Sequence, residues 1–361
     1  SCDSLERVSR IASAIPVIEA VVVVPKLSEE LDISLIDNAL LWQECMADTT
    51  RPLHFVPRQF NDPLFILYSS GTTGVPKCIV HGIGGTLLQH AKEHVLHANV
   101  ARDDRFFYFT TCGWMMWNWL VSGLARGATL ILYDGSPFAR EGRRLIDAID
   151  EEHITVFGVG AKYLGALEKS GIWPATDHSL SSLQTILSTG SPLPHESFEW
   201  VYRAFKSDLH LASISGGTDI VSCFVGGVPT LPVYPGQIQA PGLGMATAIW
   251  NEEGAAVEEE KGELVCTRAF PSCPVGFWQD PDGSKFHEAY FSRWSGIWAH
   301  GDYGEITPEG GYIIHGRSDA VLNPGGVRIG TAEIYRQVER VPEVLDSVVV
   351  GQAWQEDVRV V

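Results

Sequence analysis

Short apolar runs alternate with amphipathic stretches from residue 64 to about residue 215, and this rhythm constrains the fold more than any other feature of the chain. The apolar runs have the length of strands and lie at Phe106 to Thr111, Thr129 to Tyr133, Thr155 to Val159, Leu183 to Leu187 and Leu209 to Ser215. Helical apolar spacing occurs between them, at Thr86 to Ala98, Gly142 to Glu151, Ala161 to Lys169 and Pro194 to Phe205. The pattern predicts an α/β fold, with a mainly parallel sheet and crossover helices. Ligands of such sheets bind at the carboxyl ends of the strands.

A different pattern follows. Helical spacing disappears from about residue 220 to residue 318, where short runs such as Gly262 to Cys266 and Gly311 to His315 lie between Gly, Pro and Asp turns. We expect a β-rich subdomain there.

A third segment begins after Asp319. The Gly-rich turn Asn323 to Gly326 leads into Thr331 to Arg340, which has helical spacing, and Thr331 is the expected N-cap. We therefore predict a large domain over residues 1–318 and the start of a small α+β domain over residues 319–361.

A loop rich in hydroxyl groups and glycine follows the apolar run Leu64 to Leu67, which we expect to be a strand buried on both faces of a parallel sheet. Amide, hydroxyl and ammonium donors that can surround an anion are offered by Ser69, Ser70, Gly71, Thr72, Thr73, Gly74 and Lys77. The loop differs from the Walker pattern, because Pro76 precedes the lysine and no Ser or Thr follows it. The sequence predicts a polyphosphate-binding loop, and the alternative is an ordinary polar turn.

The composition limits the partners of the chain. A net charge of −18 argues against a nucleic-acid or anionic membrane surface, so small molecules are the expected ligands. The seven Cys residues form no CxxC pair and are expected to be free thiols. No segment has the length of a membrane span, and Ile15 to Pro25, interrupted by Pro16 and Glu19, is expected to be a buried strand. These features indicate a cytosolic, cytoplasmic protein without membrane insertion.

In their order along the chain, these segments resemble the adenylate-forming acyl-CoA synthetases. The loop Tyr68 to Lys77 resembles the signature loop of that superfamily. Thr111 to Asn118, Leu132 to Pro137 and Leu211 to Ile220 resemble the members that act on acetoacetate. The resemblance covers nearly all of the chain. It implies an acid–thiol ligase that uses ATP, Mg²⁺ and coenzyme A to form an acyl-adenylate and then acetoacetyl-CoA, with release of AMP and pyrophosphate.

Alternative functions remain open at this point. The chain could belong to an enzyme for another short acid, acetate or propionate, or to a nucleotide-binding module without full catalytic activity. An adenylation domain that serves a carrier protein is a further option. The resemblance also implies that an N-terminal region and the adenylation lysine lie outside residues 1–361, so we expect a fragment that is inactive alone.

The resemblance implies roles for residues of the nucleotide site. The loop with Lys77 would stabilise the leaving pyrophosphate, Thr218 would approach the α-phosphate, and Asp219 would hold Mg²⁺. The superfamily has Glu at the last position, so the shorter Asp219 is expected to act through a bound water. Asp302 would accept hydrogen bonds from the ribose hydroxyls, and Arg317 would contact ribose or the α-phosphate. The alternatives are a turn cap at Asp219, a turn at Asp302 and a solvated arginine.

Further residues are assigned to the adenine and the acyl group. Gly190, Ser191 and Pro192 resemble the segment that lines the adenine pocket, with Ser where the superfamily has Glu, and a simple turn before a helix is equally compatible. The acyl pocket is assigned to Trp114, Met115, Met116, Gly216 and Gly217, with plain core packing as the alternative for the Met and Trp cluster. Gly216 stands where acetate enzymes carry Trp, so we expect it to deepen the pocket, and Gly216→Trp to test this.

The last group concerns the small domain. Asp319 matches the hinge about which that domain turns between half-reactions. Asn323 to Gly330 resembles the loop that lines the pantetheine tunnel, with Gly325, Gly326 and Arg328 on the coenzyme A side. The alternative is a Gly-rich solvent loop.

Overall fold

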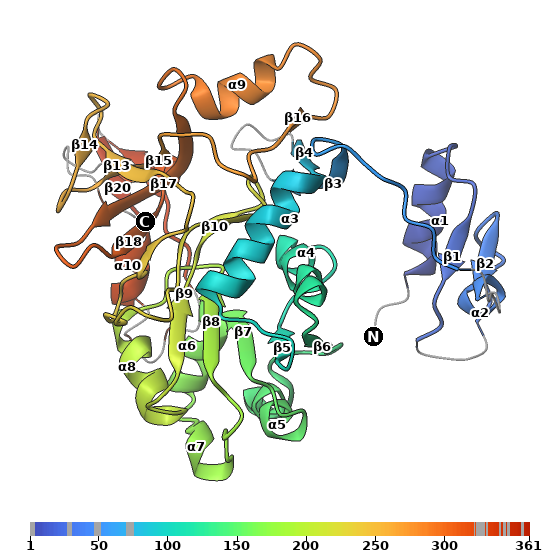
Figure 1. Cartoon of the computed structure of the whole chain (residues 1–361), viewed down its shortest axis with the longest axis horizontal. Coiled ribbons are helices and arrows are strands. Elements are labelled where there is room, and N and C mark those ends of the chain that lie inside the picture. The colour runs from blue at the N-terminus through green and yellow to red at the C-terminus, as the bar shows by residue number, and fades with distance from the viewer. Residues whose placement is uncertain are drawn as a thin grey trace. The chain divides into compact units, whose positions relative to one another are not determined.

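The computed structural model describes residues 4–26, 31–46, 52–69, 76–320, 322, 329, 331–338, 341, 344, 347–354 and 357–361. The chain divides into two compact units, residues 1–57 and residues 58–361 (Figure 1). The described residues contain no helix that is long and apolar enough to cross a membrane. The boundary expected near residue 318 stays a prediction.

The first unit is small. Its elements are α1 (Leu5–Ala14), β1 (Val21–Val23), β2 (Ala39–Leu41) and α2 (Trp42–Cys45). Strands β1 and β2 pair in parallel. The expected buried strand over Ile15 to Pro25 is wrong, because β1 covers only three residues and Val17 and Val24 are 84% and 59% exposed. A unit of this size does not enclose enough apolar surface to bury both faces of a strand.

The second unit is built on a parallel sheet with the strand order β6-β5-β7-β8-β9. Its strands are β5 (Arg105–Tyr108), β6 (Thr129–Ile131), β7 (Val156–Gly160), β8 (Thr185–Thr189) and β9 (His210–Ser213). All neighbouring pairs in this sheet are parallel, so the α/β prediction is confirmed.

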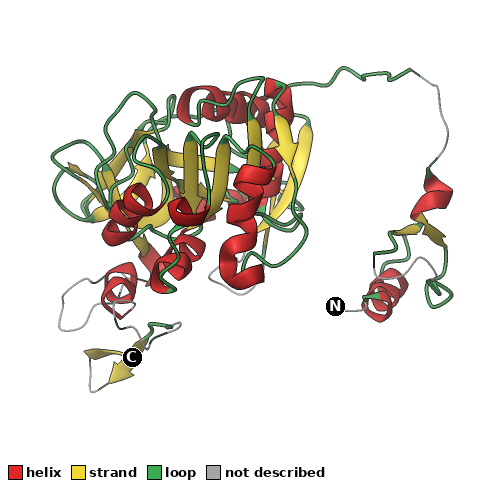
Figure 2. Ribbon diagram, turned by 90° about the horizontal axis from the view of Figure 1, so that it is seen from below, coloured by secondary structure: helices red, strands yellow, loops and turns green. Residues whose placement is uncertain are grey.

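Helices lie on both sides of this sheet (Figure 2). They are α3 (Ile83–Lys92), η1 (Glu93–His97), α4 (Met115–Ser122), η2 (Gly123–Arg126), η3 (Ala139–Gly142), α5 (Arg143–Glu151), α6 (Ala161–Lys169), α7 (Pro174–Asp177) and α8 (His195–Ala204). The stretch expected as one helix over Thr86 to Ala98 is an α-helix followed by a π-helical turn, η1. Helix α4 was not expected, because its sequence is apolar on nearly every side and shows no helical period.

The two faces of the sheet bury alternate residues. Phe107, Phe157, Ile186 and Leu211 lie side by side across four strands and pack with residues of α5, α6 and α8. The residues between them belong to a second core, which includes Tyr108 and residues of α4. This period of two places one face of the sheet, with its strand ends, against α4.

Antiparallel strands make up most of the remainder. One sheet has the order β14-β13-β15-β17-β18, with β13 (Thr247–Trp250), β14 (Ala256–Val257), β15 (Gly262–Cys266), β17 (Trp298–Ile306) and β18 (Tyr312–Arg317). A second joins β10 (Ser215–Gly217), β11 (Ser222–Gly226) and β12 (Ala240–Pro241). A third joins β3 (Pro63–Ser69), β4 (Lys77–Gly82) and β16 (Gly276–Phe277). The expected β-rich segment is confirmed, although it also contains helix α9 (Ser284–Phe291).

The C-terminal elements follow β18. They are η4 (Ser318–Ala320), α10 (Thr331–Val338), β19 (Gly351–Trp354) and β20 (Asp357–Val360). Thr331 is the first helical residue of α10 rather than the residue before it. The Lys261 ammonium forms an ion pair of 2.7 Å with Glu333 of α10, which ties this helix to the β-rich segment.

Candidate active site

The expected phosphate loop connects two antiparallel strands. β3 pairs with β4 from Pro63 to Ser69, and alternate residues of β3 are exposed, including Ile66 and Tyr68. The expectation of a doubly buried parallel strand is therefore wrong, since a short apolar run does not distinguish a parallel strand from one arm of a hairpin. Ser70, Gly71, Thr72, Thr73 and Gly74 lie outside the described residues, while Ser69 and Lys77 end and begin the two strands.

Lys77 and Asp219 form an ion pair, and Tyr290 completes the cluster. The Lys77 ammonium contacts Asp219 Oδ1, and the Tyr290 hydroxyl donates a hydrogen bond to the same oxygen. The Lys77 ammonium also lies 3.2 Å from the Tyr290 hydroxyl. Burial raises the pKa of Asp219, but Lys77, His300 and these hydrogen bonds outweigh it, so the pKa lies below its usual value. Asp219 is a carboxylate that already has a cationic partner.

Tyr290 was missed by the sequence analysis. It lies on α9, 71 residues from Asp219, and its ring stacks on Trp298 with the centroids 3.8 Å apart. No local motif surrounds it. Only the packing of α9 against β17 places its hydroxyl beside the ion pair.

Asp302 and Arg317 lie opposite each other on β17 and β18. Arg317 Nη1 donates a hydrogen bond of 3.1 Å to Asp302 Oδ1 and one of 3.1 Å to the carbonyl oxygen of His300. The Asp302 side chain is buried, whereas that of Arg317 is 50% exposed. Gly301 has a φ of +84°, and a Cβ at this position would overlap the Arg317 guanidinium. Glycine therefore lets the guanidinium lie against the backbone.

A cavity of about 310 Å³ connects these residues to the expected acyl residues. Of the residues expected at the nucleotide, its lining includes Gly190, Ser191, Pro192, Thr218, Asp302 and Arg317. Of those expected at the acyl group, it includes Trp114, Met115, Met116, Gly216 and Gly217, and Trp119 lies in the same lining. The segment Gly190 to Pro192 follows β8, so it lies at the carboxyl end of a parallel strand, as expected. Lys77 and Asp219 are not among the lining residues.

Gly216 lines the cavity, and close backbone packing constrains it as well. A Cβ at this position would overlap the Ser222 carbonyl oxygen and Cys223 Cα in the adjacent strand β11. The residue is glycine because the β10 and β11 backbones approach each other closely at a register shift. A larger residue at position 216 would clash with the β11 backbone before it extended into the cavity. The substitution Gly216→Trp therefore does not test the depth of the acyl pocket alone.

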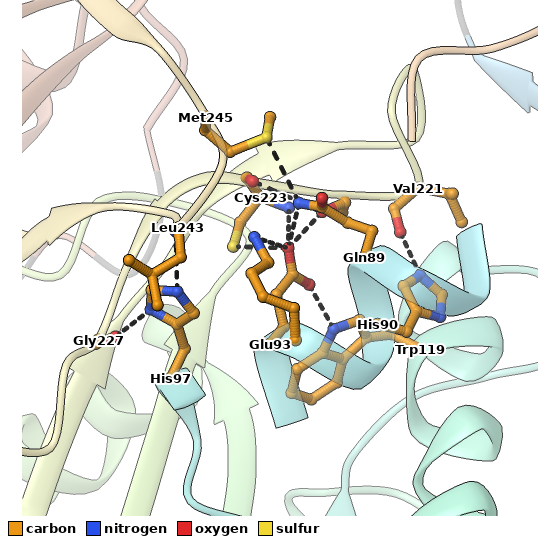
Figure 3. Close-up of polar contacts among 12 residues, drawn as sticks. Gln89, His90, Glu93, His97, Trp119, Val221, Cys223, Gly227, Leu243 and Met245 are labelled. Atoms are coloured by element: carbon orange, nitrogen blue, oxygen red, sulfur yellow. Dashed lines mark hydrogen bonds and ion pairs between the residues drawn. The ribbon is translucent and has the colours of Figure 1, made fainter. Parts of the chain in front are cut away.

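A buried polar network forms one wall of the cavity and was also missed (Figure 3). Glu93 accepts hydrogen bonds of 2.8 Å from Gln89 Nε2 and 2.8 Å from Trp119 Nε1. The Ser222 hydroxyl donates to the same carboxylate. These groups come from α3, α4 and β11, so the network holds three elements together around a single carboxylate.

Other expected residues stay untested. Gly325, Gly326 and Arg328 lie outside the described residues, and the backbone of Asp319 lies in η4. Within the described ranges, no group of three or more His, Cys, Asp or Glu side chains could hold a metal ion.

The parallel sheet, the β3–β4 hairpin and the cavity at the strand ends agree with the comparisons with known proteins. The chain belongs to the AMP-binding enzyme family, whose model matches residues 3–270. Acetoacetyl-coenzyme A synthetase of Rhizobium meliloti (strain 1021) is 63% identical over 310 residues, which cover 86% of this chain and 48% of that protein. Acetoacetyl-CoA synthetase of Gallus gallus is 52% identical over 355 residues, 96% of this chain and 53% of that protein.

Solved structures give the same result. Acetoacetyl-CoA synthetase from Streptomyces lividans has a TM-score of 0.89 and 45% identity, and the match covers 97% of this chain and 53% of that one. An anthranilate CoA ligase in complex with anthranoyl-AMP has a TM-score of 0.81 at 22% identity, covering 99% of this chain and 65% of that one, which supports the fold alone. The chain spans about half the length of the curated relatives it matches.

Proposed function

We propose that the protein is an acid–thiol ligase that joins acetoacetate to coenzyme A at the expense of ATP. An acetoacetate carboxylate oxygen would attack the α-phosphorus, and the bond from this phosphorus to pyrophosphate would break. The thiolate of coenzyme A would then attack the acyl carbon and release AMP. The observation that carries the proposal is the continuous cavity that has polar nucleotide-type residues on one side and Trp114, Met115 and Met116 on another.

The names of the relatives support acetoacetate as the acid. Relatives from bacteria and vertebrates with 50–63% identity are acetoacetyl-CoA synthetases. The apolar side chains near Trp114 would surround the methyl ketone, and Met side chains adapt to small irregular groups.

On the nucleotide side, each residue has chemistry that fits its proposed role. Asp302 offers acceptor oxygens for two ribose hydroxyls once Arg317 turns toward phosphate or ribose. Thr218 lines the cavity and can donate its hydroxyl to the α-phosphate. Gly190 to Pro192 would contact adenine through backbone groups, since the Glu of the superfamily is replaced by Ser191.

Lys77 and Asp219 would exchange partners when ATP binds. Lys77 would turn to the β- and γ-phosphates, while Asp219 would hold Mg²⁺, which shields phosphate charge when it is bound. Magnesium in such sites commonly takes one or two carboxylates together with substrate phosphates and waters, so a lone Asp219 fits this role. Tyr290 would keep Asp219 oriented during the exchange. The roles of Asp319, Gly325, Gly326 and Arg328 in coenzyme A binding, and a cytosolic location, stay predictions.

The test is ATP–pyrophosphate exchange by the full-length protein with acetoacetate, acetate, propionate and butyrate. We expect exchange to be fastest with acetoacetate, followed by formation of acetoacetyl-CoA when coenzyme A is added. A preference for acetate or propionate would replace the substrate assignment. Binding of ATP without exchange for any acid would instead support a nucleotide-binding module.

A further inference from the structure

Glu93 is a buried acid that the proposed chemistry does not use. It is the first residue of the π-helical turn η1, its exposure is 1%, and it lines the cavity. Among its neighbours in Figure 3, Trp119 and Cys223 also line the cavity. A carboxylate in the wall of an acyl site needs an explanation, because burial of a charge is costly unless it is paired and hydrogen-bonded.

The hydrogen bonds identify Glu93 as ionised. Its Oε1 accepts from Gln89 Nε2 at 2.8 Å, from the Ser222 hydroxyl and from Cys223 N at 3.4 Å. Its Oε2 accepts from Trp119 Nε1 at 2.8 Å. These surroundings offer donors to both oxygens, which favours the carboxylate. Burial alone would raise the pKa of Glu93, but Lys92 and the hydrogen bonds from Ser222 and Trp119 lower it.

Glu93 is the member of a buried ion pair that faces the cavity. Lys92 Nζ lies 3.7 Å from Glu93 Oε1 and offsets part of its charge, but Lys92 is not among the lining residues. Burial lowers the pKa values of His90 and His97 and brings that of His94 to about 3, so all three are neutral near pH 7. The His97 ring has a partner at each nitrogen, because Nδ1 donates to the Gly227 carbonyl and Nε2 accepts from Leu243 N.

The remaining groups near Glu93 add no positive charge to this wall. Burial raises the pKa of the Cys223 thiol well above its usual value, so it is neutral. Of the described residues that line the cavity, Arg317 is the cationic one, and it lies on the nucleotide side with Asp302.

We infer that Glu93 is a specificity-determining residue that excludes acids with a second negative charge and directs the single carboxylate of the substrate toward the nucleotide side. This inference rests on the proposed function. Its sharpest consequence concerns malonate, which has the shape of acetoacetate with an oxyanion in place of the terminal methyl group. Shape alone would admit malonate, whereas repulsion by a buried carboxylate would reject it. Malonamate, in which a neutral amide replaces that oxyanion, is the matched control.

The experiment measures kcat/KM for adenylation of acetoacetate, malonamate and malonate at about pH 8, where malonate is a dianion. We expect the wild-type protein to use malonate at least about tenfold less well than malonamate, as a charge repulsion of about 1.4 kcal/mol requires. Glu93→Gln should reduce this malonamate-to-malonate ratio at least about tenfold. The KM for ATP should change little, because the nucleotide side is untouched.

A second variant protects the test against misfolding. In Glu93→Gln, the NH₂ group of the side-chain amide would face the Trp119 N–H, so two hydrogen-bond donors would point at each other. Glu93→Gln combined with Trp119→Phe removes the conflict, and Trp119→Phe alone keeps the charge. We expect the ratio to fall in both variants that lack the charge and to stay near the wild-type value in Trp119→Phe.

The outcomes separate the inference from the proposed function. Equal use of malonate and malonamate by the wild-type protein would overturn the role of Glu93 while acetoacetate use continued. An unchanged ratio in both variants without the charge would do the same. Failure to adenylate acetoacetate or any monocarboxylate would overturn the proposed function itself.

Discussion

The residues proposed to hold the nucleotide and the cavity wall around Glu93, proposed to face the acyl group, are built in different ways. The charged residues proposed for the nucleotide form small groups: Asp302 pairs with Arg317, and Lys77, which does not line the cavity, pairs with Asp219. On the acyl side, a single carboxylate, Glu93, joins three elements that are up to 130 residues apart in the chain. We expect the first group to exchange its partners for a ligand and the second to keep a fixed shape.

The two groups of residues should contribute differently to the free energy of unfolding and to the rate. Ion pairs that open toward a ligand contribute little to stability by themselves, and their value appears when substrate replaces one partner. A fully buried and hydrogen-bonded charge is costly to disturb, because its partners then remain buried without a counterpart. Variants on the acyl side should therefore reduce stability first, and those on the nucleotide side should reduce rate first.

The largest effect is expected for Glu93→Ala. Loss of the carboxylate leaves the Gln89, Trp119 and Lys92 donors buried without their acceptor, so the free energy of unfolding should fall by about 3 to 5 kcal/mol. Urea unfolding measures this. The control is Glu151→Ala, which removes an exposed pair with Arg144 and should cost less than about 1 kcal/mol. Equal losses in the two variants would contradict the contrast between the sides.

Lys77→Met should act on rate instead. Removal of the cation proposed to stabilise the leaving pyrophosphate should reduce kcat for adenylation by about 10² to 10³. Stopped-flow release of pyrophosphate provides the measurement. Tyr290→Phe is the control, because it removes a hydrogen bond to Asp219 but keeps the cation, and it should lower kcat by less than about tenfold. If Tyr290→Phe lowered kcat as much as Lys77→Met, the charge of Lys77 would not explain the loss of rate.

Two neighbouring glycines test whether close backbone contact shapes the acyl side. Gly216→Ala forces a Cβ against the β11 backbone and should destabilise the protein by about 1 to 3 kcal/mol. A Cβ at Gly217 would lie 3.9 Å from His300 Nε2, an ordinary contact, so Gly217→Ala should be nearly neutral. Thermal unfolding of the two variants gives the comparison. If Gly216→Ala left the thermal stability unchanged, Gly216 would again be interpreted as a residue that makes room in the acyl pocket.

The smallest effect on stability is expected when the pH is lowered by one unit. Burial lowers the pKa of His94 to about 3 and that of His81 to about 4, both below the ordinary value of 6.5. Below pH 6.5 the unfolded chain binds protons that the folded protein does not, so stability falls as pH falls, by at most about 1.4 kcal/mol per pH unit for each histidine. Unfolding measured between pH 7 and pH 5 should show this slope. His94→Gln should reduce it, and an unchanged slope would contradict the assignment.

The parallel sheet could be predicted from sequence because its strands are buried and its helices are amphipathic, and both patterns are local. β3 was assigned to the wrong kind of sheet, because Leu64 to Leu67 carries no information about the strand it pairs with. Helix α4 escaped prediction because Met115 to Leu120 is apolar at every position but Asn118, so no period of 3.6 residues is visible.

The prediction of the site residues was limited in the same way, because only local patterns can be recognised in a sequence. Asp302 and Arg317 were predicted to serve one nucleotide site, and the structure places them side by side. Glu93 and Tyr290 could not be predicted, because their partners come from distant segments and neither lies in a motif. One signal was available for Glu93: the run His90 to His97 is too polar for a helix that must cover a sheet, which marks a buried polar cluster.

The π-helical turn η1 has a consequence for how this protein tolerates length changes. Ala98 N donates to the carbonyl oxygen of Glu93, five residues earlier, so the turn holds one more residue than an α-helix would. Deletion of one residue between positions 94 and 97 would let this turn close as an ordinary α-helical turn, because the turn holds the extra residue. In a regular α-helix the same deletion would rotate the following side chains by about 100°. We therefore expect this end of the helix to accept the loss of one residue with less disturbance of the later chain than α3 would.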